Sequence, residues 1–215
     1  MHRFIKSIGK FPTRLAPISR RPKLTDLNES ITFSDIAEQL NELNLSIYTP
    51  SLYIFDSVKD DYEINMEGSG ISIDGREKGL RKLMATNLLK RLESSINSFR
   101  LTLTRITDYI EQTLAVIDRH ENISTIEVTT DDLDSTDSEN DPFVGKKSKI
   151  NLKDIDVVRW SNDLRHDHEI LKLLLLMLKD ITPAHDCKLQ MLVSDLKEKF
   201  QHPINEGNKK VLIFT

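Results

Sequence analysis

The sequence is poor in residues that cross-link a chain or interrupt regular structure. Its 215 residues include one cysteine, Cys187, together with 7 glycines and 7 prolines. A single cysteine excludes an intramolecular disulfide and favours a reducing compartment, and the scarcity of glycine and proline favours a mainly helical protein. The longest apolar run, Leu173 to Leu178, is too short to span a membrane. We therefore expect a mainly α, cytoplasmic protein without a membrane partner.

Acidic residues are missing from the start of the chain. Residues 1–23 carry only basic charges, although the net charge of the whole chain is -4. Pro12, Pro17 and Pro22 recur at five-residue intervals and favour an extended conformation over residues 1–24. Such a segment is either a solvated loop or edge strand, or a contact for nucleic-acid phosphates. Its composition also resembles a mitochondrial transit peptide, but the prolines would interrupt the amphipathic helix that such a peptide forms.

Basic residues are missing from a second stretch, residues 127–141, which is acidic and rich in Ser, Thr and Asn. It has no packing pattern, and it lacks the glycine and closing glutamate of a calcium-binding loop. We therefore predict an acidic mobile loop over residues 121–149.

Residues 74–119 have the strongest helical pattern in the chain. They contain no proline, and their only glycines, Gly75 and Gly79, stand at the start. Asp74 is a candidate N-cap, and Glu77 follows three residues later, as in a capping box. Apolar residues recur in steps of three and four, close to the heptad period, at Leu89, Leu92, Ile96, Phe99, Leu103, Ile106 and Ile110. The pattern predicts one helix of roughly 65 Å, which another segment or a partner must cover along its length.

A second long helix is predicted over residues 152–181, with Asn151 as its N-cap. Its apolar stripe is Ile155, Val158, Leu164, Leu171, Leu174, Leu178 and Ile181. The run from Leu173 to Met177 makes it apolar nearly all round, which predicts the best-buried segment of the chain. The simplest arrangement packs it antiparallel against residues 74–119 as a helical hairpin.

Shorter elements are predicted on the N-terminal side of these helices. Thr32, as a cap, begins a helix that ends by Thr49 because Pro50 follows. The apolar face of this helix is Ile36, Leu40, Leu43 and Ile47. Residues 51–55 are short, apolar and aromatic, which is typical of a strand or a buried anchor.

On the C-terminal side, Thr182-Pro183 predicts the start of a helix over residues 183–201. Residues 206–215 then end in four apolar residues, Val211 to Phe214, the pattern of a buried parallel strand. Such a strand needs neighbours, so we expect a fragment that is cut where a second α/β domain begins.

The sequence contains no motif that would carry catalysis. Neither phosphate-binding glycine pattern, G-x-x-x-x-G-K-[ST] or G-x-G-x-x-G, is present. His166, His168 and Glu169 cluster on the second long helix, but a metal site needs three or four converging ligands. We therefore expect no catalytic, cofactor-binding or metal-binding residue. The candidate contacts for DNA phosphates are Arg3, Lys6, Lys10, Arg14, Arg20, Arg21, Lys90 and Arg91.

Three stretches resemble the superfamily-two helicases, most closely the bacterial Swi/Snf-like DNA translocases. Residues 207–215, preceded by Asp186-Cys187-Lys188-Leu189, resemble the entry to the second RecA-like motor domain. Phe11-Pro12-x-Arg14 and the residues that follow resemble the tail of the first motor domain. Residues 81–99 include L-L-K-R-L-E-S-S, which is similar to the opening of a helical insertion between the motors in bacterial members.

The resemblance implies three parts in the order 1–56, 57–205 and 206–215. The first would be the tail of the first motor domain, the second a helical insertion, and the third the first strand of a truncated second motor domain. The fold class expected is mainly α, a long antiparallel helical hairpin with further amphipathic helices and short β segments at the two ends.

The family couples ATP hydrolysis, which requires ATP and Mg, to movement on duplex DNA. Its ATP-binding and arginine motifs fall outside these residues, so no catalytic residue is carried over and the chain alone is expected to be inactive. DNA is then a partner through the parent protein, and a protein partner could bind the helical hairpin. The alternatives are a stand-alone helical scaffold or protein-interaction module, and direct DNA binding by this chain.

Overall fold

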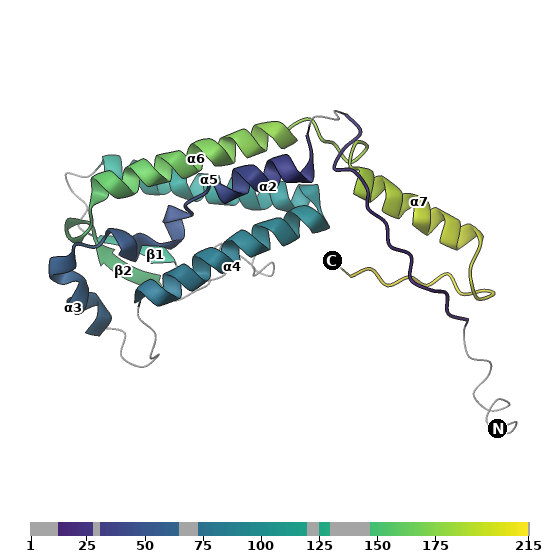
Figure 1. The fold of residues 1–215 in the computed structure, drawn as a ribbon, viewed down its shortest axis with the longest axis horizontal. Coiled ribbons are helices and arrows are strands. Elements are labelled where there is room, and N and C mark those ends of the chain that lie inside the picture. The colour runs from purple at the N-terminus through teal and green to yellow at the C-terminus, as the bar shows by residue number, and fades with distance from the viewer. Residues whose placement is uncertain (1–12, 28–30, 65–72, 120–124, 130–146, 215) are drawn as a thin grey trace, which may run out of the picture. The chain divides into compact units, whose positions relative to one another are not determined.

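The computed structural model describes residues 13–27, 31–64, 73–119, 125–129 and 147–214. It confirms the expectation of a mainly α-helical protein (Figure 1). The chain forms two compact units: a helical unit, Phe33–Asp180, and a flank unit that joins Met1–Thr32 to Ile181–Thr215. Within the described ranges, no helix is both long and apolar enough to cross a lipid bilayer.

The helical unit is a bundle whose helices lie side by side (Figure 1). Helix α5 packs against both α4 and α6, and the shorter α2 also packs against α4 and α6. The helices are α2 (Phe33–Asn41), α3 (Lys59–Ile64), α4 (Ile73–Ser94), α5 (Ile96–Asp118) and α6 (Val157–Leu178). Single 3-10 turns form at Ser46–Tyr48, Pro50–Tyr53, Asp56–Val58 and Leu152–Asp154. Because α2 belongs to this bundle, the structure divides the chain after residue 32 and not at the predicted residue 56.

The single helix predicted over residues 74–119 is wrong, because the chain forms two helices that meet at Ser95. The backbone of Ser95 is extended, with φ -156° and ψ 125°, and its hydroxyl oxygen accepts a hydrogen bond from the N–H of Ser98 at 3.3 Å. The chain turns back at this residue, so α4 and α5 lie against each other (Figure 1). Leu92 and Phe99 are buried on the two sides of the break. The apolar seam is thus covered within the chain, without the external partner that a single helix would need.

The predicted antiparallel hairpin is confirmed for α5 and α6. Near the end of α5, Asp118 pairs with Arg165 at 3.2 Å, and Glu111, earlier on the same helix, pairs with His168 at 2.8 Å. The residue numbers therefore fall along α5 as they rise along α6, which is antiparallel packing. The fully buried side chains of α5 and α6 include Phe99, Leu103, Ile106, Ile110, Trp160, Leu164, Leu171 and Leu174.

The prediction that the run from Leu173 to Met177 makes the best-buried segment of the chain is wrong. Val158 and Leu176 are 72% and 65% exposed, and Leu173 is also exposed. Helix α6 packs against α2, α5 and the 3-10 turns at Ser46–Tyr48 and Pro50–Tyr53, and these contacts leave Val158, Leu173 and Leu176 at the surface. On α4, Leu89 is likewise exposed although the periodic pattern included it.

The connection between α5 and α6 is more regular than the predicted loop over residues 121–149. Strands β1 (Thr125–Thr129) and β2 (Lys147–Asn151) pair antiparallel, with Thr125 opposite Asn151. Residues 130–146, which hold most of the acidic run, lie outside the described residues. Asn151 caps the following 3-10 turn by accepting from the N–H of Lys153, and Asp156 is the N-cap of α6.

Two predictions near the start of the helical unit are corrected by the structure. Helix α2 ends at Asn41 and not near Thr49, because the chain turns through a left-handed residue, Leu45, with φ 53°. Residues 51–55 form a buried anchor more than a strand: Tyr53 and Ile54 are buried, and Ile54 makes an isolated antiparallel bridge to Ile155.

The flank unit contains one described helix, α7 (Cys187–Gln201). It starts at Asp186, whose carboxylate accepts from the N–H of Leu189 at 2.9 Å, and not at the predicted residue 183. Residues 182–186 form a turn in which the Thr182 carbonyl accepts from the N–H groups of His185 and Asp186. The carboxylate of Asp186 therefore takes the capping role that the sequence assigned to Thr182.

The strand predicted over residues 206–215 is absent from the described part of that range. Leu212 is 84% exposed and Phe214 is 91% exposed, and the backbone of residues 208–214 forms no regular element. A strand needs a hydrogen-bonded neighbour, and none of the described segments pairs with this one. The short β segments therefore lie in the α5–α6 connection, not at the two ends as predicted.

Candidate functional site

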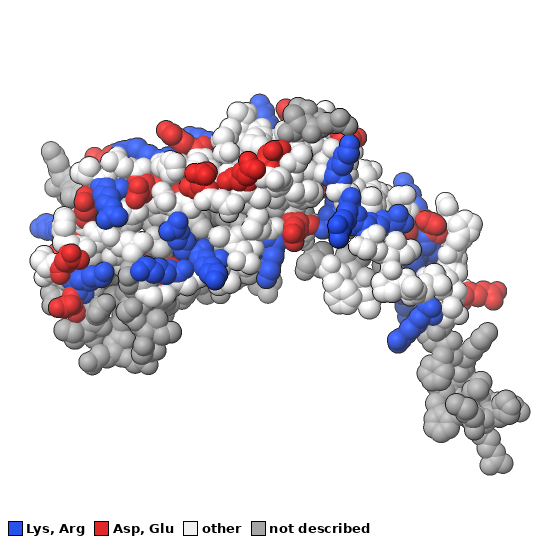
Figure 2. Space-filling model, viewed as in Figure 1, with Lys and Arg blue, Asp and Glu red and all other residues white. Residues whose placement is uncertain are grey.

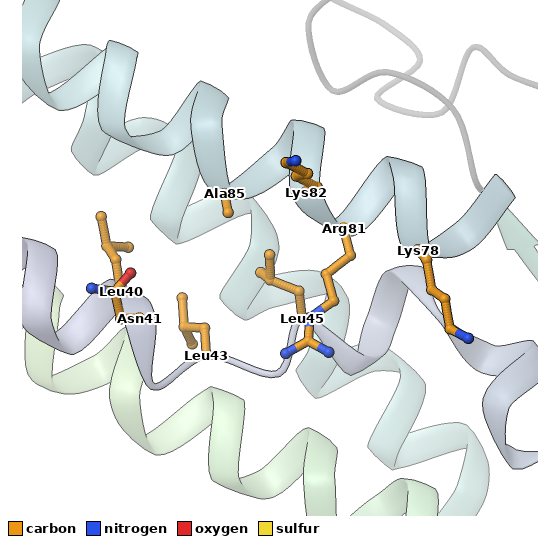
Figure 3. Close-up of a pocket in the computed structure, with 8 residues that line it drawn as sticks. All are labelled: Leu40, Asn41, Leu43, Leu45, Lys78, Arg81, Lys82 and Ala85. Carbon is orange, nitrogen blue, oxygen red and sulfur yellow. The ribbon is translucent and has the colours of Figure 1, made fainter. Parts of the chain in front are cut away.

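A pocket opens on the surface of the helical unit between α4 and the end of α2 (Figure 3). Its volume is about 450 Å³. One wall comes from α2 and the loop after it, and the other from α4. The lining residues are Leu40, Asn41, Leu43, Leu45, Lys78, Arg81, Lys82 and Ala85. Apolar side chains and three basic side chains thus meet in one depression, and no carboxylate is among the described residues that line it.

A buried aspartate holds the loop that forms one wall. Asp167 on α6 is 1% exposed, and its two carboxylate oxygens accept from the N–H groups of Asn44 and Ser46, each at 2.7 Å. These bonds enclose Leu45, whose left-handed backbone is unfavourable for a bulky side chain. Burial raises the pKa of Asp167, and the hydrogen bonds from Ser46 and Asn44 oppose that rise.

Two aromatic residues, Trp160 and Tyr53, also support this loop. The indole N–H of fully buried Trp160 donates to the Ser46 carbonyl at 3.1 Å. Tyr53 packs next to Trp160, with ring centroids 6.3 Å apart, and its hydroxyl donates to Asp163 at 2.7 Å. Burial is the main cause of the raised pKa of Tyr53. The loop wall is therefore fixed by a carboxylate and an indole, both on α6.

Another buried carboxylate fixes α4 against the loop. Glu77 is 3% exposed and accepts from both the backbone N–H and the hydroxyl of Ser51. From the sequence, Glu77 is predicted to take part in a capping box. In the structure, the Glu77 side chain instead joins α4 to the 3-10 turn at Pro50–Tyr53. The next residue, Lys78, lies at the rim of the pocket, so this contact helps to position the basic face of α4.

The described residues predicted to contact DNA phosphates are divided between the two units. Arg14, Arg20 and Arg21 belong to the flank unit, while Lys90 and Arg91 lie on α4 of the helical unit. Arg20 pairs with Asp195 at 3.0 Å. Arg14, Arg21 and Lys90 are exposed. Arg3, Lys6 and Lys10 lie outside the described residues.

One histidine of α6, His168, takes part in a surface ion pair. His168 Nε2 lies 2.8 Å from Glu111, which also pairs with Lys172 at 3.2 Å. The hydrogen bond with His168, followed by that with Lys172, lowers the pKa of Glu111. His166 is exposed and His185 pairs with Asp26 at 3.0 Å. Within the described ranges, no group of three or more His, Cys, Asp or Glu side chains could hold a metal ion.

Sequence reasoning did not find the pocket. In Figure 2, Lys and Arg side chains form a row over the surface that α4 contributes. Lys78, Arg81 and Lys82 are spaced three and four residues apart, which places them on one side of the helix. That spacing could have predicted a basic face on this helix. The opposing leucines could not be assigned to the same place without knowing that α2 packs on α4.

Comparisons with protein-family models, with curated proteins and with solved structures find no match to this chain.

Proposed function

We propose that this chain is the helical module that joins the two motor domains of a bacterial Swi/Snf-like DNA helicase or translocase. In this proposal, the parent protein is a cytoplasmic, ATP-dependent hydrolase that binds nucleotide with Mg and acts on DNA. The chain itself carries no ATPase motif and does not hydrolyse ATP. The resemblance of three separate stretches, in the family's order, is the sequence support for this proposal.

The observation that carries the proposal is the pairing of the two flanks. Residues before the helical unit contact residues after it, as expected of a module inserted into a continuous domain framework. Thr25 forms an isolated antiparallel bridge with Asp186, and Arg20 pairs with Asp195 at 3.0 Å. Thr13 exchanges two hydrogen bonds with Asn205: its N–H donates to the side-chain oxygen at 2.7 Å, and its carbonyl accepts at 3.2 Å.

A module of this kind can act as a brace between two motor lobes. The helical unit has a continuous core along α5 and α6, so it is stiff enough to transmit a displacement at its ends to a distant surface. The helical unit is joined to the flank unit by the chain at both ends, after residue 32 and before residue 181. The proposed role is to couple opening and closing of the motors to a partner.

The first test is the coding sequence on either side of this chain. We expect a phosphate-binding loop and an acidic metal-binding motif upstream, and arginine-bearing helicase motifs downstream. Flanking sequence without these motifs would overturn the proposal.

The second test uses the parent protein. Replacing residues 33–180 by a short Gly/Ser linker should preserve ATP binding but uncouple ATP hydrolysis from translocation along DNA. The matched control keeps the helical unit and carries Thr86→Ala, a change at an exposed position on α4. Unchanged DNA-stimulated ATPase and unchanged translocation in the linker variant would contradict a coupling role.

A protein-interaction scaffold is the second candidate function. It is favoured by Leu173 and Leu176, large apolar side chains exposed on α6. Direct DNA contact is the third, and a salt titration tests it. Direct contact would be supported if the chain binds duplex DNA, if the binding weakens steeply with salt, and if it is lost on deletion of residues 1–23. Absence of binding at low salt would confine DNA contact to the motors.

A further inference from the structure

We propose that the pocket between α2 and α4 binds an acidic peptide segment of a partner protein, in which an apolar side chain is flanked by Asp or Glu. The inference does not depend on the function proposed above. It follows from the residues that line the pocket, from their charge, and from the way the loop wall is held in place.

The floor of the pocket is apolar. Leu40, Leu43, Leu45 and Ala85 supply it from both walls (Figure 3). A volume of about 450 Å³ exceeds that of any one side chain and falls at the lower end of the range of about 300–1,000 Å³ that is typical of ligand sites. An apolar side chain with part of its backbone therefore fits the depression and gains from leaving water.

The rim is basic on the α4 side. Lys78, Arg81 and Lys82 line it together, and the side chain of Arg81 extends from α4 towards Leu45 (Figure 3). Cations at the edge of an apolar depression favour a ligand whose carboxylates lie next to its apolar group. Two acidic residues near this wall, Glu38 on α2 and Glu42 after it, are exposed but do not line the pocket. Because these two carboxylates would repel the acidic groups of the ligand, we expect those groups to lie on the α4 side of the pocket.

The wall opposite this rim is pre-organised. Leu45 keeps its left-handed backbone because Asp167 accepts from the N–H groups on both sides of it. Strained residues persist where the surroundings over-determine them, and such residues cluster at binding sites. A wall fixed before binding loses little further conformational freedom, which favours affinity for a short segment.

Duplex DNA fits this surface less well. Its phosphate backbone would satisfy the basic rim, but it presents no apolar group to cover the leucines of the floor. A peptide offers both chemistries within neighbouring residues. The observations therefore favour a protein segment over nucleic acid.

The experiment is selection of binders from a random displayed-peptide library on the full chain. We expect enriched peptides to place Asp or Glu beside Leu, Phe or Met. The double variant Arg81→Glu and Lys82→Glu should weaken a selected peptide at least tenfold. The matched control, Lys90→Glu with Arg105→Glu, makes the same charge change at exposed positions outside the pocket and should change affinity less than twofold.

Another variant tests the apolar floor without touching charge. Ala85→Trp fills the pocket and should weaken the same peptide at least tenfold, while thermal melting followed by circular dichroism establishes that each variant is folded. The proposal is overturned if no peptide is enriched, if enriched peptides lack acidic residues, or if both charge-reversal pairs weaken binding equally. It is also overturned if duplex DNA displaces the peptide and itself depends on Arg81 and Lys82.

Discussion

The helical unit buries most of its large apolar side chains, whereas many large apolar side chains of the flank unit are exposed. Phe99, Trp160 and Leu171 have no exposed surface, while α7 contains no buried residue over its 15 positions. Both regions have amphipathic sequence. The difference teaches that an apolar stripe becomes a core only when another element supplies a matching face. Helices α5 and α6 supply it to each other, whereas the flank unit contains no other described helix or strand beside α7.

The largest effect is expected from Trp160→Ala. The variant should lower the free energy of unfolding by about 3–5 kcal/mol, the usual range for loss of a buried aromatic side chain. It also removes the indole N–H that donates to Ser46. Urea unfolding followed by circular dichroism measures the change.

The matched change in the flank unit is Leu192→Ala, at an exposed position on α7. Because little apolar surface is lost there, the expected change is below about 1 kcal/mol. Equal losses in the two variants would break the contrast between the units.

An effect smaller than that of Trp160→Ala is expected from Asp167→Asn, which leaves one side-chain oxygen to accept from two N–H groups. One of those N–H groups loses its acceptor within the protein, so the free energy of unfolding should fall by about 1–3 kcal/mol. Unfolding measured as a function of pH then reports the sign of the pKa shift.

The pKa of Asp167 is raised in the folded protein, mainly by burial. Its contribution to stability is therefore complete below the ordinary pKa of an aspartate, and it is lost as the pH rises through the raised value. The asparagine variant lacks this titration, so the difference between wild type and variant should shrink as the pH rises. A difference that grows with pH would contradict the raised pKa.

Ser95→Ala should cost about 1 kcal/mol, the usual value of an N-cap. The hydroxyl of Ser95 satisfies the N–H of Ser98 where α5 begins. Thr86→Ala on α4 is the control, because its hydroxyl bonds only a carbonyl of its own helix. A thermal melt should separate the two variants; equal melting temperatures would mean that Ser95 does not determine the break.

The smallest effect is expected from Arg20→Ala in the flank unit. Arg20 and Asp195 are both nearly half exposed, and pairs of this kind contribute about 0.2–1 kcal/mol. A double-mutant cycle with Asp195→Ala, at low and at high salt, measures the coupling, which should weaken with salt. A coupling that is independent of salt would show that the pair is less accessible to water than its exposure indicates.

The sequence predicted the helices and the α5–α6 hairpin because their apolar spacing is periodic over many residues. It missed the break at Ser95, because the apolar seam continues through the serine without a change of spacing: Leu92, Ile96 and Phe99 keep their intervals. A capping serine inside such a seam becomes visible only when the two halves pack on each other.

The pocket was beyond sequence reasoning for a related reason. Its two walls are separated by more than thirty residues, Leu45 to Lys78, and its shape depends on Asp167 from a third element. Burial of that aspartate could not be inferred, because it stands between His166 and His168 in a polar stretch. Only the backbone N–H groups of the facing loop explain why a carboxylate is placed inside.

The contact between Asp26 and His185 joins residues 159 apart in the sequence. Closing so long a loop in an unfolded chain costs more conformational entropy than pairing neighbouring helices, so we expect the helical unit to fold first. During synthesis, residues 13–27 must wait until residues 185–205, which they contact, have left the ribosome, whereas α4 and α5 can associate much earlier. The flank unit would then form after the helical unit, and a chain interrupted before residue 185 would keep its bundle while residues 13–27 lose their partners in the second flank.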